Sequence, residues 1–436
     1  MFKYTKLSTG IALASLVITS QTVNAAGFAL NDHSATASGN ALAGVAASNE
    51  DISTSFWNPA NLANTDKPTL YISGALVIPD MKVTVNSATD ATGNDLTGAS
   101  SPGDIVDTTL VPSIVYAHPI SKKTVLGASL NVPFGLSGEY GPNWAGRYHS
   151  SKSEVSDIAF AFSVAHKYSD KLSVGASVQL HSAEVILDSA LTDFQGGNSA
   201  KGDGFGNIQA DDLAVGYALG IKFEPQKGTR IGIGYRSEID FSFEGDVKYN
   251  NVNSTLLSKG IDNAYVFDEI SFPDVLSFGF EQDINDKLTL GASAIRTGWG
   301  TMDGLDIAFD LGDDNVKQPN SVLTFGFEDQ WLYSIGATYK ASKKLTLRTG
   351  YAVDNSPITD QYRSARTPDG DRTWISLGAS YQVNQEMTLT AAYTNVSIDD
   401  VKVNRNGAPE DSVRGRLDAD YETSADVFSV GMNMTF

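Results

Sequence analysis

The chain has 436 residues, and its 51 acidic against 31 basic residues give a formal charge of −20. An acidic chain without a basic run argues against nucleic acid binding. The complete absence of cysteine excludes thiol catalysis and cysteine metal sites, and it suits an exported protein that needs no disulfide.

Residues 1–25 have the pattern of a secretory signal peptide. Lys3 and Lys6 precede the apolar run Ile11–Ile18, and small residues follow up to Ala25. Such a segment is too short for a membrane helix. We therefore expect export and a mature chain that begins at Ala26.

The next stretch, residues 26–64, is rich in Ala, Ser, Gly and Asn. It shows neither a helical apolar stripe nor a sustained alternation, so it cannot build a core of its own. A barrel with a polar interior could hold such a small-residue segment. We predict that residues 26–67 form a hatch, or plug, inside a barrel made by residues 68–436.

From Pro68 to Phe436, runs of alternating apolar and polar residues recur between polar turns, as in the last run, Phe428–Phe436. After Ala25 no window holds 18 uninterrupted apolar residues, which excludes helical membrane spans. A β-barrel suits this composition, because only alternate residues of its strands face lipid.

The connections between these runs fall into two classes. Six are short and polar, at residues 121–123, 169–171, 225–228, 285–287, 342–344 and 384–386. Seven are long and rich in Gly and Asp, at about 80–107, 135–152, 189–208, 246–268, 303–318, 356–370 and 404–423. The fold class predicted is therefore all-β, a 14-stranded antiparallel transmembrane β-barrel with external long loops and an N-terminal hatch in its wide lumen.

Several segments, in order, resemble the FadL-type transporters of Gram-negative outer membranes. Ala26–Phe28 and Asn58–Ala60 resemble the N-terminal hatch of that family. Further matching segments lie at residues 131–136, 144–148, 235–238, 347–357 and 368–374. The resemblance covers the whole mature chain and implies an outer-membrane location.

The resemblance also implies a function, the uptake of hydrophobic molecules, above all long-chain fatty acids, without an energy source. In family members the ligand is captured among the external loops and passes to a pocket beside the hatch N-terminus. It then leaves sideways through a gap at a kinked third strand. The predicted partners are thus a hydrophobic small molecule and outer-membrane lipids, and a barrel with its own exit is expected to act as a monomer.

The third run of this chain starts at Thr124 and carries Pro133, Phe134 and Gly135. A proline cannot donate a ladder hydrogen bond, and a glycine leaves no side chain to fill the pleat. We expect the wall to be weakest here and to form the lateral opening. The alternative is that Pro133 merely ends the strand.

Two further groups of residues have both a functional and a structural interpretation. Asn58, Pro59 and Ala60 are expected to form the hatch turn, or else a plain loop turn. Phe28 and Leu30 are expected to contact an apolar ligand, or else to pack the plug.

The sequence departs from the fatty-acid branch at two stretches where that branch carries basic residues. Glu184–Asp188 and Phe327–Gln330 contain no Arg or Lys. A neutral or aromatic hydrocarbon is therefore an alternative ligand. Arg147, Arg236 and Arg296 could instead bind a carboxylate, or each could form an ion pair.

Other functions find little support. The five histidines are scattered, without an H-E-x-x-H pair or a G-x-S-x-G elbow, so we predict no enzyme activity, no metal and no cofactor. Acidic runs such as Asp399-Asp400 could bind divalent cations or could simply be solvated. A general porin is the main rival, but it should lack so long a segment before its first strand.

Overall fold

The computed structural model describes residues 27–192, 202–311 and 318–436. The predicted signal peptide, residues 1–25, lies outside the described residues. Within these ranges no helix is both long and apolar enough to cross a bilayer.

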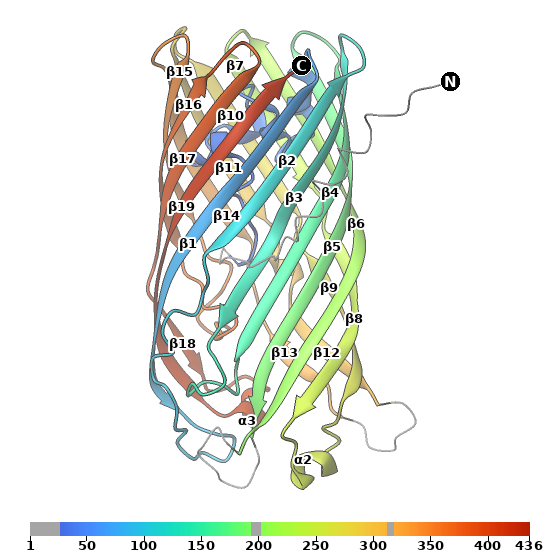
Figure 1. Ribbon diagram of the computed structural model, residues 1–436, viewed down its shortest axis with the longest axis vertical. Coiled ribbons are helices and arrows are strands. Elements are labelled where there is room, and N and C mark those ends of the chain that lie inside the picture. The colour runs from blue at the N-terminus through green and yellow to red at the C-terminus, as the bar shows by residue number, and fades with distance from the viewer. Residues whose placement is uncertain (1–26, 193–201, 312–317) are drawn as a thin grey trace, which may run out of the picture.

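Nineteen strands in the described ranges form one sheet that closes on itself, because β19 pairs with β1 (Figure 1). In chain order they are β1 (Thr69–Ala88), β2 (Thr109–Pro119), β3 (Thr124–Glu139), β4 (Lys152–Lys167), β5 (Leu172–Leu191), β6 (Gly204–Gln226), β7 (Thr229–Arg236), β8 (Ile239–Asn250), β9 (Ala264–Phe272), β10 (Val275–Asp283), β11 (Leu288–Thr297), β12 (Gly304–Asp310), β13 (Ser321–Thr324), β14 (Gln330–Lys340), β15 (Leu345–Asp354), β16 (Arg372–Gln382), β17 (Met387–Ile398), β18 (Val401–Arg405) and β19 (Leu417–Thr435).

Ten of these strands are halves of five interrupted wall strands: β7 with β8, β9 with β10, β11 with β12, β13 with β14, and β17 with β18. The two halves of each wall strand pair with the same neighbour, as β7 and β8 both pair with β6. The wall is therefore an antiparallel barrel of fourteen strands, which confirms the predicted fold class.

The connections follow the predicted asymmetry. All six short turns and the C-terminus lie at one end, at the top of Figure 1, and the long loops lie at the other. Several loops are shorter than predicted, because the strands run further: β1 has 20 residues and β6 has 23. A tilted strand needs only about 9 to 11 residues to cross a bilayer, so the wall projects beyond the membrane on the loop side.

The two faces of the wall differ in polarity. Along β6, Leu213 and Val215 are 66% and 67% exposed on the outside, whereas Ala214 and Ala218 are buried inside. Other strands repeat this alternation. A continuous apolar belt therefore faces outward, as a membrane barrel requires.

Residues 27–64, which we call the N-terminal segment, lie inside the barrel near its short-turn end (Figure 1). The segment contains the short helices α1 (Ala35–Ser38), η1 (Val45–Ala47), η2 (Ile52–Phe56) and η3 (Pro59–Asn64). Ser34, Asp51 and Asn58 cap α1, η2 and η3 with their side-chain oxygens. The remaining helices are α2 (Ser254–Ser258), η4 (Trp299–Thr301) and α3 (Asp411–Arg414).

A ring of glycines lets the backbone of the N-terminal segment approach the wall closely. On Gly350, for example, a Cβ would come within 3.0 Å of the Asn40 carbonyl oxygen, and on Gly232 within 3.0 Å of that of Ala46. A Cβ would likewise come within 3.0 Å of an atom of the N-terminal segment at eight further glycines, Gly127, Gly175, Gly220, Gly234, Gly279, Gly291, Gly336 and Gly378. We call these ten residues the glycine ring. It runs from β3 round the barrel to β16.

Replacing a glycine of this ring should displace the N-terminal segment. We expect Gly350→Ala to make the free energy of packing the N-terminal segment against the wall about 1–3 kcal/mol less favourable. The added methyl group meets backbone atoms, which cannot rotate away as a side chain could. The measurement is protease protection of residues 27–64 in the purified barrel. Gly138→Ala is the matched control, because a Cβ there meets nothing within 4 Å. Equal protection in both variants would contradict this account.

Candidate functional site

The wall is incomplete along one edge of β3. Its ladder with β2 stops at the pair Leu130 and Ile114, although β3 continues to Glu139. On its other side, the register with β4 shifts between Asn131 and Phe134, which places one extra residue in β3. Pro133 therefore lies in a bulge and does not end the strand, so the alternative of a simple strand end is wrong.

The start of the N-terminal segment covers this open edge. The Leu30 amide donates to the Pro133 carbonyl oxygen and the Gly135 amide donates to the Phe28 carbonyl oxygen, both at 2.8 Å. Residues 28–30 thus take the place that β2 leaves vacant beside β3. All six residues from Asn131 to Leu136 are buried, which departs from the alternation of the rest of the wall.

Phe28 is enclosed by aromatic rings that come from interruptions in the wall. Its ring centroid lies 4.6 Å from that of Trp299, 5.3 Å from Phe272 and 6.0 Å from Phe134. Phe272 ends β9 and Trp299 lies in η4, so two neighbouring wall strands break at the height of the β3 bulge. We call Phe134, Phe272 and Trp299 the aromatic cage of Phe28.

Glycine is required at position 27. Its φ angle of +61° is one that side chains disfavour, and a Cβ would lie 2.6 Å from the Trp299 ring. The Gly27 amide donates to the Asp369 carboxylate, at 3.1 Å, in the loop before β16. Gly27 and Phe28 therefore meet the segment at residues 368–374, far away in the sequence, at the aromatic cage.

An apolar column leads from the aromatic cage towards the long loops. One cluster of buried side chains joins Phe28 and Phe134, through Phe241 and Phe243, to Leu187 and Ile307. The last two also line a cavity of about 610 Å³ among the loops, which we call the mouth cavity. A continuous cluster of buried apolar side chains therefore connects the mouth cavity with the open edge of β3.

The structure separates the two predicted ligand contacts. Phe28 belongs to the apolar column, whereas Leu30 packs in a second cluster with Leu42, Trp57 and Val132. Phe28 therefore faces the route from the mouth, and Leu30 faces the body of the N-terminal segment.

Asn58 anchors the N-terminal segment to the wall. Its amide nitrogen donates to the carbonyl oxygens of Ala46, at 2.6 Å, and of Ile221 in β6, at 3.0 Å. Its side-chain oxygen accepts from the Ala60 amide at 2.9 Å. Pro59 and Ala60 pack where Gly175 leaves room. The predicted turn motif thus contacts the wall through each of its three residues.

The three arginines considered as carboxylate partners differ in their contacts. Arg147 pairs with Asp203 at 2.6 Å, and Arg296 pairs with Asp274 and Asp329. Arg236 is buried over the Phe56 ring at 4.1 Å, and none of the described carboxylates lies within 4.0 Å of it. Arg236 is therefore the one of the three whose charge is free for another partner.

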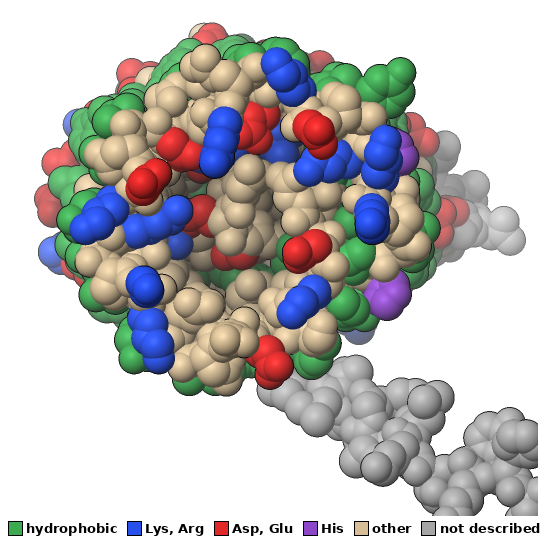
Figure 2. Space-filling model, turned by 90° about the horizontal axis from the view of Figure 1, so that it is seen from above, with side chains coloured by type: hydrophobic (Ala, Val, Ile, Leu, Met, Phe, Trp, Pro, Cys, Tyr) green, Lys and Arg blue, Asp and Glu red, His purple; other side chains and the backbone are tan. Residues whose placement is uncertain are grey.

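The short-turn end has the opposite character. A polar cavity of about 390 Å³ opens between the N-terminal segment and the wall. Figure 2 views this end, where Lys and Arg side chains ring the rim and acidic side chains lie among them. An apolar molecule would have to cross this charged surface to leave through the short-turn end.

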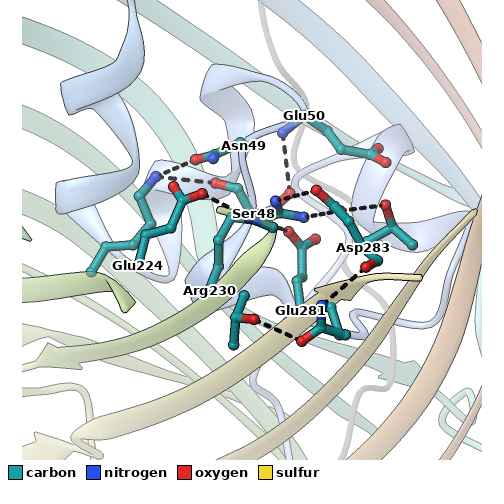
Figure 3. Close-up of polar contacts among 12 residues, drawn as sticks. Ser48, Asn49, Glu50, Glu224, Arg230, Glu281 and Asp283 are labelled. Atoms are coloured by element: carbon teal, nitrogen blue, oxygen red, sulfur yellow. Dashed lines mark hydrogen bonds and ion pairs between the residues drawn. The ribbon is translucent and has the colours of Figure 1, made fainter. Parts of the chain in front are cut away.

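Polar contacts also fasten the N-terminal segment at this end, where Ser48, Asn49 and Glu50 lie beside Arg230, Glu281 and Asp283 of the wall (Figure 3). Arg348 pairs with Glu50 at 2.6 Å, and the Lys222 ammonium donates to the Asn49 side chain at 2.6 Å. Arg230 bridges Glu281 and Asp283 beside them, at 2.8 Å each. The body of the segment is thus held by the glycine ring, by one ion pair and by the Lys222 hydrogen bond.

Sequence reasoning missed the aromatic cage and the glycine ring. Phe272 is followed by Pro273 and Trp299 is flanked by Gly298 and Gly300, and these breaks in alternation were a usable signal. The glycines of the ring gave no such signal, because a single glycine in a strand does not show what it faces.

Comparison with known proteins identifies relatives over the whole chain. A family model described as outer membrane protein transport protein (OMPP1/FadL/TodX) matches residues 15–436. A long-chain fatty acid transport protein of Escherichia coli strain CFT073 is 27% identical over 413 residues, covering 88% of this chain and 89% of that protein. A putative outer membrane protein of Neisseria meningitidis serogroup B is 28% identical and covers 100% and 98%.

Solved structures share the fold. A FadL homologue of Pseudomonas aeruginosa superposes with a TM-score of 0.84 at 24% identity, covering 94% of this chain and 100% of that one. The toluene transporter TodX of Pseudomonas putida superposes with a TM-score of 0.64 at 19% identity, covering 87% and 92%.

The start of the N-terminal segment should respond to pH through Asp32. Burial raises the pKa of Asp32 to about 6, although the Arg372 cation opposes the shift. A carboxyl whose pKa is raised by docking stabilises the docked state fully below about pH 4, and this contribution is lost as the pH rises towards 6. Residues 28–30 should therefore dock more tightly at pH 5 than at pH 7.

Asp32→Asn should remove this dependence and tighten docking at pH 7 by up to about 3 kcal/mol. Hydrogen exchange of the Leu30 amide measures the docking. Asp66→Asn, at an exposed position beyond η3, is the control. An unchanged pH profile in Asp32→Asn would contradict the assignment.

Proposed function

The chain belongs to the OMPP1/FadL/TodX family of outer-membrane transporters of hydrophobic compounds, and from that premise we propose that it takes up long-chain fatty acids by lateral diffusion through its wall. In this proposal residues 26–67 act as the hatch and residues 68–436 as the barrel. The open edge of β3, paired only with residues 28–30, is the observation that carries it. The transporter acts as a monomer, because the whole route lies within one barrel.

The ligand enters at the mouth cavity and follows the apolar column to the aromatic cage. There it takes the place of Phe28, and residues 28–30 leave the edge of β3. The ligand then passes beside Pro133 into the hydrocarbon of the membrane without meeting water. The turn at Asn58, Pro59 and Ala60 keeps the rest of the hatch seated during this passage.

Two ligand classes remain in competition. The name of the Escherichia coli relative supports a fatty acid, whereas the TodX structure comes from a toluene transporter. The stretches Glu184–Asp188 and Phe327–Gln330 lack a basic residue and favour a neutral hydrocarbon. Uptake of oleate and of toluene in a transporter-null host would discriminate between them.

A general porin is the weaker candidate. A porin keeps a water-filled channel, whereas here the N-terminal segment packs against the glycine ring across the lumen. Single-channel recording in planar bilayers distinguishes the two. Steady, large conductance from the wild-type protein would refute the proposal of a plugged barrel.

Deleting Pro133 should abolish uptake without unfolding the barrel. The deletion removes the extra residue from the bulge, so the ladder with β4 becomes regular and the edge stiffens. The double variant P133V/G135V should act in the same direction. We expect oleate uptake to fall at least about tenfold, measured with labelled oleate in a transporter-null host.

Pro225→Val is the matched control, because Pro225 also lies at a register irregularity of a wall strand, between Phe223 and Gln226 of β6, but at the short-turn end and not beside β3. This variant should transport normally. Wild-type uptake by the Pro133 deletion, in a barrel shown to be folded, would refute the lateral route.

A further inference from the structure

Two arginines project from loops into the mouth cavity at the long-loop end of the barrel. Arg366 follows β15 in the chain, and Arg414 ends α3 (Figure 1). Both side chains are half-buried, and both line the cavity. Their contacts set them apart from the other arginines of these loops.

Arg366 donates only to uncharged oxygens. Its terminal nitrogens reach the Lys152 carbonyl oxygen at 2.9 Å, the Ser153 hydroxyl at 2.9 Å and the Asp188 carbonyl oxygen at 3.1 Å. A longer contact, of 3.4 Å, reaches Ser150. Its Nε is buried without a hydrogen-bond partner among the described residues. The charge of Arg366 is thus solvated by dipoles and not neutralised.

Arg414 also lacks an ion-pair partner among the described residues. Its guanidinium donates to the Val322 carbonyl oxygen at 2.9 Å, and none of the described carboxylates lies within 4.0 Å. By contrast, Arg363 pairs with Asp360 and Arg405 pairs with Glu410, so paired arginines lie close by in the same loops.

The carboxylates nearest to the two arginines have other partners. Glu410 lines the cavity, but it pairs with Arg405 at 2.6 Å and also accepts from the Thr324 amide. Asp411 also pairs with Arg405, at 3.2 Å, and Asp188 accepts from the Asn207 side chain. These carboxylates are therefore engaged elsewhere, and none of the described ones forms an ion pair with Arg366 or Arg414.

The two arginines also affect the titration of their neighbours. Burial and the Arg414 cation lower the pKa of Arg366 to about 9, although the Asp188 carboxylate opposes the shift. Burial, followed by the cations Arg414, Arg405 and Arg366, lowers the pKa of His149 to about 3, so this histidine stays neutral. An anion placed between the arginines would relieve the repulsion.

The rest of the cavity suits an apolar tail. Its lining includes Leu187, Leu191, Ile208, Val247, Phe309 and Val413. Leu187 continues into the apolar column that ends at Phe28. A molecule with an anionic head at the arginines and a hydrocarbon tail in the column would satisfy both parts of the cavity.

We propose that Arg366 and Arg414 recognise the anionic head of an amphiphile, so that the mouth cavity selects carboxylates with long apolar tails over neutral hydrocarbons. This inference rests on the proposed function of the cavity as the point of entry. It also accounts for the missing basic residues at Glu184–Asp188 and Phe327–Gln330, because recognition of the head lies in the loops and not in the wall.

The test compares two ligands that share one tail. Radiolabelled oleate and oleyl alcohol are bound to the purified full chain in detergent. Arg414→Gln should weaken oleate binding about ten- to hundredfold, the usual effect of losing a charged hydrogen bond, and change oleyl alcohol binding less than about twofold. Arg414→Lys should restore part of the oleate affinity, and added salt should weaken oleate binding alone.

Arg366→Gln provides a second variant with the same expected pattern. Should it fail to fold because loop contacts are lost, Arg414→Gln and Arg414→Glu decide the question. Arg416→Gln is the matched control, because Arg416 is exposed two residues away and does not line the cavity. It should bind both ligands as the wild type does.

The outcomes separate the inference from the proposed function. If the wild type binds neither ligand, the proposed function fails and the inference fails with it. If the wild type binds both ligands and the arginine variants bind oleate equally well, only the inference is overturned. An equal loss for oleate and oleyl alcohol would also overturn it, because that pattern indicates damage to the cavity and not loss of charge recognition.

Discussion

The contact on which the structure depends is the close approach of the N-terminal segment to the wall at the glycine ring. A fourteen-stranded barrel encloses a lumen that its own side chains do not fill. Here the filling comes from a segment with little apolar surface, which can be held only by backbone packing, caps and polar contacts. Glycine in the wall makes such packing possible, since Gly232 and Gly350 admit carbonyl oxygens of the segment where any side chain would exclude them.

This packing decides which part of the interior can serve an apolar ligand. Between the aromatic cage and the short-turn end the lumen is occupied by the N-terminal segment, and the remaining space is a polar cavity with ion pairs such as Arg348 with Glu50. Between the cage and the long-loop end the lining is apolar up to the mouth cavity. Neighbouring wall strands break at the boundary between the two halves, and there residues 28–30 are joined to β3 by two hydrogen bonds.

The sequence predicted the wall better than its contents. Alternation and turn chemistry predicted the number of wall strands correctly. They also predicted that the short turns lie at one end of the barrel and the long loops at the other, because alternation and turns are local properties of the chain. Pro133 and Gly135 marked the bulge for the same reason. The aromatic cage could not be derived, because Phe28, Phe134, Phe272 and Trp299 are far apart in sequence and meet only after the barrel closes. The pairing of Arg147 and Arg296, and the absence of an ion pair at Arg236, likewise depend on register between strands.

The open edge of β3 shows why a lateral exit needs both a proline and a displaceable partner. In hydrocarbon, each unsatisfied backbone group costs several kcal/mol, so a bare ladder edge is excluded. Pro133 has no N–H and thereby removes one such group, while residues 28–30 satisfy the Pro133 carbonyl oxygen and the Gly135 amide. Releasing these residues leaves the Pro133 carbonyl oxygen and the Gly135 amide without partners, at several kcal/mol each in hydrocarbon, and gives up the burial of Phe28, about 1.5–3 kcal/mol. At about 0.8 kcal/mol per buried methylene, on the order of ten methylene groups of a ligand in the aromatic cage offset that cost. A long acyl chain reaches this length and a small aromatic ring does not, so the energetics of the edge favour the longer ligand.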